Sequence, residues 1–202
     1  MALTPETLIL ASASTARATL LRAAGIEFAV EPAAIDETAI KLQYQASGFA
    51  VEACAAALAE AKARAIAARY PAALVIGADQ ILLTGDEWFD KPDDLASAAA
   101  QLRRLRGREH VLVTAACVVS AAEVVWQALA APKLTMRRFG EAFLAGYIAA
   151  EGDAVLGSVG AYRIEGRGVQ LFARIEGDHF AILGLPLLEL LGFLRGRGVL
   201  GE

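Results

Sequence analysis

The chain has 202 residues, of which 56% are hydrophobic and 21% charged, and its formal net charge is −4. This composition excludes a disordered chain and allows a large core, and the length suits one domain or two small lobes that share a core. No apolar stretch is long enough and free enough of charge to predict a transmembrane helix. The net negative charge argues against a protein that binds nucleic acid.

Two features of the chain predict its cellular compartment. The N-terminal stretch MALTPETLILASAS has no Lys or Arg before its apolar part, which favours a strand over a signal peptide. Cys54 and Cys117 lie in apolar surroundings without CxxC spacing, as structural thiols of a reducing cytosol do. We therefore expect a cytoplasmic protein that is not bound to a membrane.

The first predicted elements are a strand, a turn and a helix. Residues 8–11 form a short apolar strand, and Ser-Ala-Ser-Thr at 12–15 precedes an amphipathic helix that Gly25 closes. Free backbone N–H groups at such a helix start bind phosphate well. Arg17 lies in the first turn, where its charge opposes the helix dipole. That position favours a nearby anion, and a solvated Arg17 is the alternative.

A second strand is predicted over residues 27–34, and the adjacent acids Asp36 and Glu37 follow it in a loop. On an extended chain their side chains point in opposite directions, so only one of them can face a site. A long Ala-rich helix is then expected over residues 47–70, with Lys62 late in it. Paired acids in a loop and a lysine near a helix end are usually solvated, so these residues alone predict no site.

The central stretch of the sequence is residues 73–92. It begins as an apolar run to Ile76, which predicts a strand buried on both faces. Gly77, Ala78 and Asp79 follow, so an acid is expected at the end of a buried strand, where it needs a cation, a metal or water. Further on, Lys91 precedes a proline that stiffens the backbone. An acid and a cation so placed suit phosphate chemistry, while a capping Asp and a surface Lys are the alternative.

The remaining chain alternates strand and helix patterns without an internal repeat. Three apolar strands with turn residues between them predict an antiparallel meander, over residues 111–119, 124–129 and 134–139. Further elements are predicted as a hairpin at 81–89, helices at 93–105 and 140–150, a glycine-spaced loop at 157–168, a strand at 169–175, and a last helix from Pro186 to Leu194.

Four segments together resemble the Maf family of nucleoside triphosphate pyrophosphatases, which are septum-formation inhibitor homologues. They are Leu8–Ser14, Ile76–Asp79, Lys91-Pro92, and Gly160–Gly166 with Gly184-Leu185-Pro186. The resemblance implies an α/β fold over residues 1–202, with a curved mixed sheet, flanking helices and two lobes around one cleft, as in inosine triphosphatases. It also implies that a nucleoside triphosphate is hydrolysed to monophosphate and pyrophosphate with a divalent cation, Mg²⁺ or Mn²⁺, and that the chain forms a homodimer.

The resemblance assigns roles to residues by their positions in these motifs. It makes Asp79 the general base and a metal ligand, with Lys62 and Lys91 as catalytic cations. Ser12, Ser14 and Arg17 become phosphate-binding residues, and Glu37 becomes a second acid on the metal side. A triphosphate carries about four negative charges, so this set of cations and one metal suits its hydrolysis.

Three positions depart from the commonest family pattern. Ala16 stands where many members have an arginine, Gln80 replaces a threonine, and Glu165 replaces a glutamine. These residues resemble the branch that cleaves 7-methyl-GTP. A carboxylate at 165 accepts hydrogen bonds only, and guanine offers two parallel donors.

Two other functions are compatible with parts of the sequence. A nucleotide-sensing protein that arrests cell division could use the same residues, although a sensor need not keep a base such as Asp79. A Rossmann-type methyltransferase or reductase would need a glycine fingerprint after the first strand, which the sequence lacks.

Overall fold

The computed structural model describes residues 7–201. Within this range the chain divides into two compact units. The first contains the described residues up to Asp79, Thr114–Ala130 and the described residues from Asp178 onward, and the second contains Gln80–Val113 and Ala131–Gly177. A single domain with one shared cleft stays a prediction. The signal-peptide argument rests partly on residues 1–6, which lie outside the described residues.

The first unit is built on short parallel strands and helices from both ends of the chain. Strand β1 pairs in parallel with β2 and with β3, and β5 pairs antiparallel with β6. The elements of this unit are β1 (Leu8–Leu10), α1 (Thr15–Ala23), β2 (Ala29–Val30), α2 (Glu37–Ala46), α3 (Val51–Ala67), the first part of β3 (Leu74–Thr84), the second part of β5 (Glu109–Ser120), β6 (Glu123–Ala130), α6 (His179–Ile182) and α7 (Leu187–Gly196).

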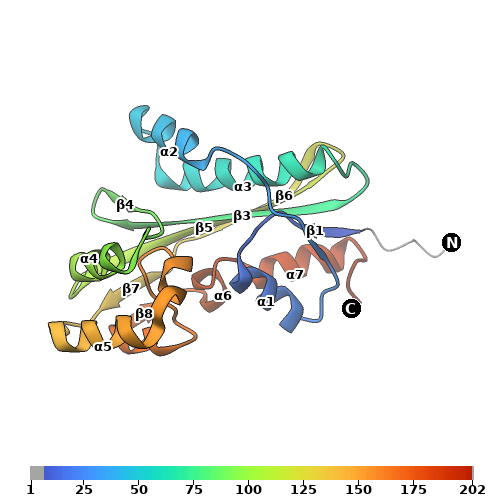
Figure 1. Ribbon diagram of the computed structural model, residues 1–202. Helices are drawn as coiled ribbons and strands as arrows, with labels where there is room; N and C mark the ends of the chain where they lie inside the picture. The colour runs from blue at the N-terminus through green and yellow to red at the C-terminus, as the bar shows by residue number, and fades with distance from the viewer. Residues whose placement is uncertain (1–6, 202) are drawn as a thin grey trace. The chain divides into compact units, whose positions relative to one another are not determined.

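Helices cover both faces of β1 and β3 in this unit. Figure 1 shows α2 and α3 on one face and α1 and α7 on the other. The core on the α1 and α7 side includes Leu10, Ile76 and Leu190, none of which is exposed to solvent. Burial on both faces explains why these strands are continuous apolar runs in the sequence.

The second unit is built on antiparallel pairs. Strand β4 pairs with the end of β3, β7 pairs with the start of β5, and β8 pairs with β7. Its other elements are β4 (Glu87–Phe89), α4 (Leu95–Leu105), β7 (Lys133–Met136), α5 (Glu141–Glu151), the 3₁₀ helices η1 (Gly152–Gly157) and η2 (Arg167–Leu171), and β8 (Phe172–Glu176). The predicted hairpin is confirmed, because Leu83 is opposite Trp88.

Parallel and antiparallel pairs together confirm the predicted α/β class with a mixed sheet and flanking helices. The side chain of Ser14 caps α1, and that of Asp94 caps α4. Among the residues described, no helix is both long and apolar enough to cross a membrane.

The end of the central strand was predicted wrongly. We expected Asp79 at the end of a buried strand, but β3 continues through Asp79 to Thr84. Gly77 is needed here for close packing and not for a turn, because a Cβ atom at this position would lie 2.0 Å from the carbonyl oxygen of Ala59. Asp79 is therefore held in the middle of a strand.

Two further predictions need correction in the surrounding elements. The loop at Asp36 and Glu37 is the start of helix α2, because the Asp36 side chain accepts a hydrogen bond from the Ala39 N–H (2.9 Å). The three strands predicted as a meander pair only in part as expected: β5 pairs antiparallel with β6, but within the described residues β7 pairs with β5 and not with β6. Strand β5 is 12 residues long, and this length lets it pair with β7 near its start and with β6 along the rest.

Candidate active site

The direction of the Asp79 side chain follows from the pleat of β3. Successive side chains of a strand point to opposite faces, so Gly77 and Asp79 share a face. Gly77 lies against Ala59 and Ala63 of α3, which shows that this face meets that helix. Lys62 lies on the same stretch of α3, so the packing that Gly77 allows brings Lys62 to Asp79.

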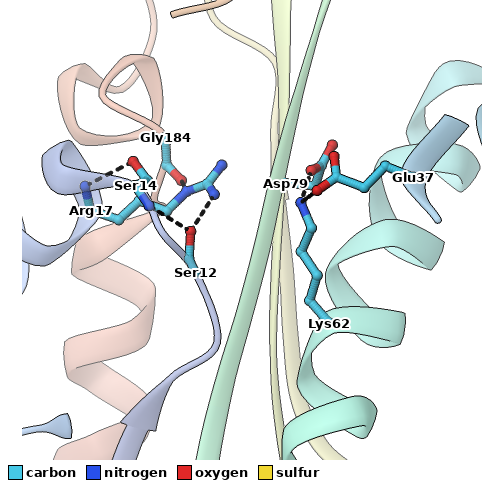
Figure 2. Close-up of polar contacts among 7 residues, drawn as sticks. All are labelled: Ser12, Ser14, Arg17, Glu37, Lys62, Asp79 and Gly184. Carbon is cyan, nitrogen blue, oxygen red and sulfur yellow. Dashed lines mark hydrogen bonds and ion pairs between the residues drawn. The ribbon is translucent and has the colours of Figure 1, made fainter. Parts of the chain in front are cut away.

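Lys62 joins two carboxylates. Its Nζ donates to Oδ1 of Asp79 at 2.6 Å and lies 2.8 Å from Oε1 of Glu37. The side chains of Lys62 and Asp79 are 9% and 7% exposed, whereas that of Glu37 is 44% exposed. A buried ammonium is costly unless it is paired. The two acids meet this cost and fix the end of the lysine side chain (Figure 2).

Helix α2 presents Glu37 to this group. Asp36 caps the helix and Glu37 is its first residue, so the two adjacent acids have different partners. That only one of them faces a site stays a prediction. Glu37, at the first position of α2, pairs with Lys62.

The second carboxylate oxygen of Asp79 has no partner among the described atoms. This oxygen, Oδ2, is buried. A buried oxygen without a hydrogen bond is energetically costly. It can bind a hard divalent cation, or it can accept a hydrogen bond or a proton from water. No group of three or more His, Cys, Asp or Glu side chains in the described residues could hold a metal ion alone. Asp79 and Glu37 therefore fit an ion that completes its coordination with substrate oxygens and water.

Arg17 is held in a second polar group after β1. Its Nε donates to the carbonyl oxygen of Gly184 at 2.7 Å, and its Nη1 donates to Oγ of Ser12 at 3.1 Å. The Ser14 hydroxyl accepts from the Arg17 backbone N–H at 3.4 Å, as an N-cap does. Arg17 is only 8% exposed. The alternative of a solvated Arg17 is therefore wrong.

The two polar groups act on each other electrostatically. Burial lowers the pKa of the Arg17 guanidinium from its ordinary value, and the negative charges of Asp79 and Glu37 act in the opposite direction. Figure 2 shows the Arg17 group and the Lys62 group on either side of the β3 ribbon. The first unit thus contains two cations and two carboxylates that influence one another electrostatically.

The other predicted site residues are placed as follows. Ala16 is partly buried on α1. Gln80, Lys91 and Glu165 belong to the second unit, so their positions relative to Asp79 stay predictions. Glu165 is 42% exposed on its side chain and accepts a hydrogen bond from Nε of Arg163 at 3.3 Å.

Sequence reasoning missed the role of Gly184. Its φ of +100° is one that glycine adopts readily, and its carbonyl oxygen holds Arg17. A Cβ atom at this position would lie 3.2 Å from Nε of Arg17. The Gly-Leu-Pro motif marks the turn in the sequence, but nothing in it indicates which side chain the backbone carbonyl binds.

Comparison with known proteins places these residues in a family. A nucleoside triphosphate pyrophosphatase of Granulibacter bethesdensis is 53% identical over 93% of this chain and 95% of its own. A protein of the same name from Paramagnetospirillum magneticum is 52% identical over 95% of this chain and 99% of its own. A 7-methyl-GTP pyrophosphatase of Rhizobium etli is 46% identical over 98% of this chain and 99% of its own.

A solved structure of a nucleoside-triphosphatase / dITP/XTP pyrophosphatase from Mycobacterium abscessus covers 96% of this chain and 95% of its own, with a TM-score of 0.46 and 16% identity. A similarity of this size leaves the inosine triphosphatase-like fold a prediction. The family model described as Maf-like protein matches residues 7–197, which is nearly the whole chain. The chain belongs to the Maf-like protein family.

Proposed function

We propose that this chain is a nucleoside triphosphate pyrophosphatase, which hydrolyses the anhydride between the α- and β-phosphates. Water adds across the anhydride, one P–O bond breaks, and the products are nucleoside monophosphate and pyrophosphate. The observation that carries this proposal is the buried Lys62, held between Asp79 and Glu37 with one carboxylate oxygen left unpartnered. Relatives that carry the name nucleoside triphosphate pyrophosphatase at 53% and 52% identity support it.

Each side chain has a distinct task in this reaction. Arg17 is fixed by Ser12 and Gly184, so its remaining N–H groups can neutralise phosphate charge without reorganisation. Lys62 supplies a second cation and holds Oδ1 of Asp79 in place through their ion pair. Oδ2 of Asp79 is the atom that orients water and accepts its proton, or that contacts the metal.

We extend the proposal to a divalent cation, Mg²⁺ or Mn²⁺. Asp79 and Glu37 would hold it, with phosphate oxygens and water as the remaining ligands. When bound, such an ion supplies positive charge to the phosphate oxygens and orients them for displacement. Lys91 is proposed as a further cation on the phosphates, as the family resemblance implies.

The finer proposal is a preference for 7-methyl-GTP. Ala16 leaves room where an arginine is common, and Glu165 offers a carboxylate to the N1–H and 2-amino donors of guanine. Methylation at N7 makes that ring cationic, which adds charge assistance to the hydrogen bonds. The Rhizobium etli relative, named 7-methyl-GTP pyrophosphatase, agrees with this preference.

Localisation and assembly are also proposed. Cys54 and Cys117 are buried free thiols, which agrees with the reducing cytoplasm. A homodimer is proposed from the family resemblance, and sedimentation of the purified chain would test it.

The test of the activity separates the two phosphate products. The chain is incubated with 7-methyl-GTP, GTP, dTTP and UTP, with Mg²⁺, with Mn²⁺ or with EDTA, and pyrophosphate and orthophosphate are measured separately. We expect pyrophosphate only, in a metal-dependent reaction. Orthophosphate as the sole product would overturn the reaction, and full activity in EDTA would overturn the metal.

The test of specificity uses the same nucleotides. We expect 7-methyl-GTP to have the highest kcat/KM, and Glu165→Gln to reduce its lead about ten- to a hundred-fold, the discrimination that a good bidentate contact gives. Glu52→Gln, at an exposed position of α3, is the matched control and should leave the ranking unchanged. A lead for dTTP or UTP would refute the preference while leaving the pyrophosphatase reaction intact.

A further inference from the structure

The second unit contains a buried histidine that the proposed reaction does not use. His110 on β5 is 1% exposed, and its Nε2 lies 2.9 Å from the hydroxyl of Tyr162. Among the described atoms its Nδ1 is buried without a hydrogen-bond partner, so the contact to Tyr162 is the one hydrogen bond of the ring. A buried polar pair of this kind specifies one arrangement, because breaking it leaves two buried groups unmet.

Tyr162 belongs to the glycine-rich segment 160–168, which also carries Glu165. Tyr162 is 5% exposed, and its ring packs edge-on against Phe172, with 4.8 Å between the ring centroids. His110 also contacts Phe172, at 5.9 Å between centroids. The side chain of Tyr162 thus anchors one end of the segment in an aromatic cluster formed by His110, Tyr162 and Phe172.

The backbone of segment 160–168 is also conformationally restricted at both of its ends. Gly160 and Ala161 have φ of +79° and +59°, the second unusual for a residue with a side chain. At the other end, a Cβ atom on Gly168 would lie 2.4 Å from the carbonyl oxygen of Arg163. The segment therefore closes tightly on itself between Tyr162 and Gly168.

Arg163 and Glu165 extend from this closed segment. Nε of Arg163 donates to Glu165 at 3.3 Å, and Nη1 lies 3.8 Å from the carboxylate of Glu151 on α5, whose side chain is 8% exposed. The carboxylate of Glu165 is thus oriented by Arg163, its neighbour but one along the chain. Arg163 in turn directly follows the anchored Tyr162, so the position of Glu165 depends on the anchor.

We propose that His110 and Tyr162 form a positioning pair that sets base selectivity by fixing segment 160–168 so that Glu165 meets the base. This inference rests on the proposed role of Glu165 in base recognition. The pair contacts no substrate. Its effect reaches the reaction through Glu165, and it should change the relative kcat/KM of nucleotides more than the hydrolysis that they share.

The main experiment compares Tyr162→Phe, which removes the hydroxyl and keeps the ring, with the wild type. The ratio of kcat/KM for the best nucleotide to that for the worst is measured on the four nucleotides above. We expect this ratio to fall at least about five-fold, mainly through KM of the best nucleotide, with kcat of the worst nucleotide within about two-fold. An unchanged ratio, or an equal fall for all four nucleotides, would overturn the inference.

Three further variants test whether the effect of Tyr162→Phe comes from the pair itself. His110→Gln keeps a group that can hydrogen-bond Tyr162 and should retain most of the ratio, whereas His110→Phe should lose it. Tyr147→Phe is the matched control, since it removes a buried hydroxyl that contacts the same segment only at 3.4 Å from the oxygen of Ala161. If Tyr147→Phe lowered the ratio as much as Tyr162→Phe, the pair would not be the cause.

A double variant connects the pair to Glu165 and separates the two hypotheses. In the Glu165→Gln background, Tyr162→Phe should have no additional effect on the ratio, because both changes act on one contact. Additive effects would overturn the inference.

If Glu165→Gln itself leaves the ratio unchanged, base recognition by Glu165 fails, and if the wild type releases no pyrophosphate, the proposed reaction fails. If Glu165→Gln alone lowers the ratio and Tyr162→Phe does not, only the positioning pair is refuted.

Discussion

Lys62 illustrates, at the scale of single residues, why this site is built for chemistry and not for stability. Burying a lysine with two acids gives little net stabilisation, since the desolvation of the charges offsets much of their attraction. Removing Asp79, however, leaves the buried Lys62 with only the half-exposed Glu37 as a partner. The unpartnered Oδ2 of Asp79 adds to the cost. Such an arrangement is expected where a ligand or a water proton completes the group.

We expect Asp79→Asn to reduce kcat by at least about 10²-fold, as the loss of a general base or metal ligand does. Asparagine keeps the shape of the side chain and removes its charge, so the fold should persist. Turnover is measured as pyrophosphate release, and folding is followed by circular dichroism. Asp86→Asn, at an exposed position of the β3–β4 hairpin, is the control and should retain full activity. Near-normal turnover in Asp79→Asn would leave Asp79 a purely structural role.

His110 should make stability depend on pH. Burial lowers its pKa from 6.5 to about 4, so the folded protein keeps the ring neutral while the unfolded chain binds a proton below pH 6.5. Stability is therefore lost as the pH falls from 6.5 towards 4, by roughly 3 kcal/mol in all and about 2 kcal/mol between pH 7 and pH 5.

The measurement is urea unfolding of the wild type and His110→Gln at pH 7 and pH 5. Because glutamine does not titrate in this range, the variant should lose about 2 kcal/mol less than the wild type. His179→Gln, at the exposed histidine, is the matched control. Parallel losses in the wild type and His110→Gln would contradict the low pKa of His110.

At the scale of elements, the sequence predicted what local patterns determine. The apolar run of β3 and the Ser14 cap of α1 are local signals, and both are confirmed. The continuation of β3 past Gly77 could not be predicted, because Gly77 serves a contact with Ala59 that lies far away in sequence. Helix α2 was missed because the cap at Asp36 resembles a solvated pair of acids.

In the candidate site, too, local patterns could be predicted and tertiary contacts could not. Arg17, Lys62 and Asp79 were identified through the family resemblance, since none of their local patterns is specific. The pairing of Lys62 with Glu37 and the hold of Gly184 on Arg17 depend on tertiary packing. A backbone carbonyl leaves no side-chain signature, so its role appears only in the structure.

Gly77→Ala tests the packing of α3 on β3. The added methyl group would lie 2.0 Å from the Ala59 oxygen and 2.8 Å from the Cβ of Ala63, so the helix must move. We expect a loss of roughly 1–3 kcal/mol in unfolding free energy, as overpacking causes. Turnover should also fall, because Lys62 moves with the helix. Denaturant unfolding and pyrophosphate release measure the two effects.

The matched control for this change is Gly192→Ala in helix α7, where a Cβ atom would meet nothing within 4 Å. An exposed helical glycine is less favourable than alanine, so this variant should gain about 0.5–1 kcal/mol and keep its activity. If Gly77→Ala were as stable and active as the wild type, the close contact between the strand and the helix would not hold.

At the scale of the whole molecule, the net negative charge of the chain opposes the binding of a polyanionic substrate, and a metal ion would offset this repulsion. The chain carries a net charge of −4, yet the proposed substrate is a polyanion. Locally, Arg17 and Lys62 contribute +2, while Asp79 and Glu37 contribute −2, so the described group sums to zero. We therefore propose that attraction for a triphosphate depends on the added charge of a divalent cation and on further cations such as Lys91.

This balance predicts that binding of nucleotide stabilises the protein only with the metal. A 7-methyl-GTP analogue with a methylene group between the α- and β-phosphates cannot be cleaved there, so binding is measured alone. At about 100 times its Kd, such a ligand stabilises the folded state by about 2.7 kcal/mol, and for a chain of this length each kcal/mol raises Tm by about 2–4 °C. We therefore expect a Tm increase of roughly 5–11 °C with Mg²⁺, measured by thermal melting, and almost none in EDTA. The free nucleoside, which lacks phosphates, is the control and should have little effect in either buffer. An equal increase with and without the metal would mean that the side chains alone balance the triphosphate, which contradicts the zero sum of their charges.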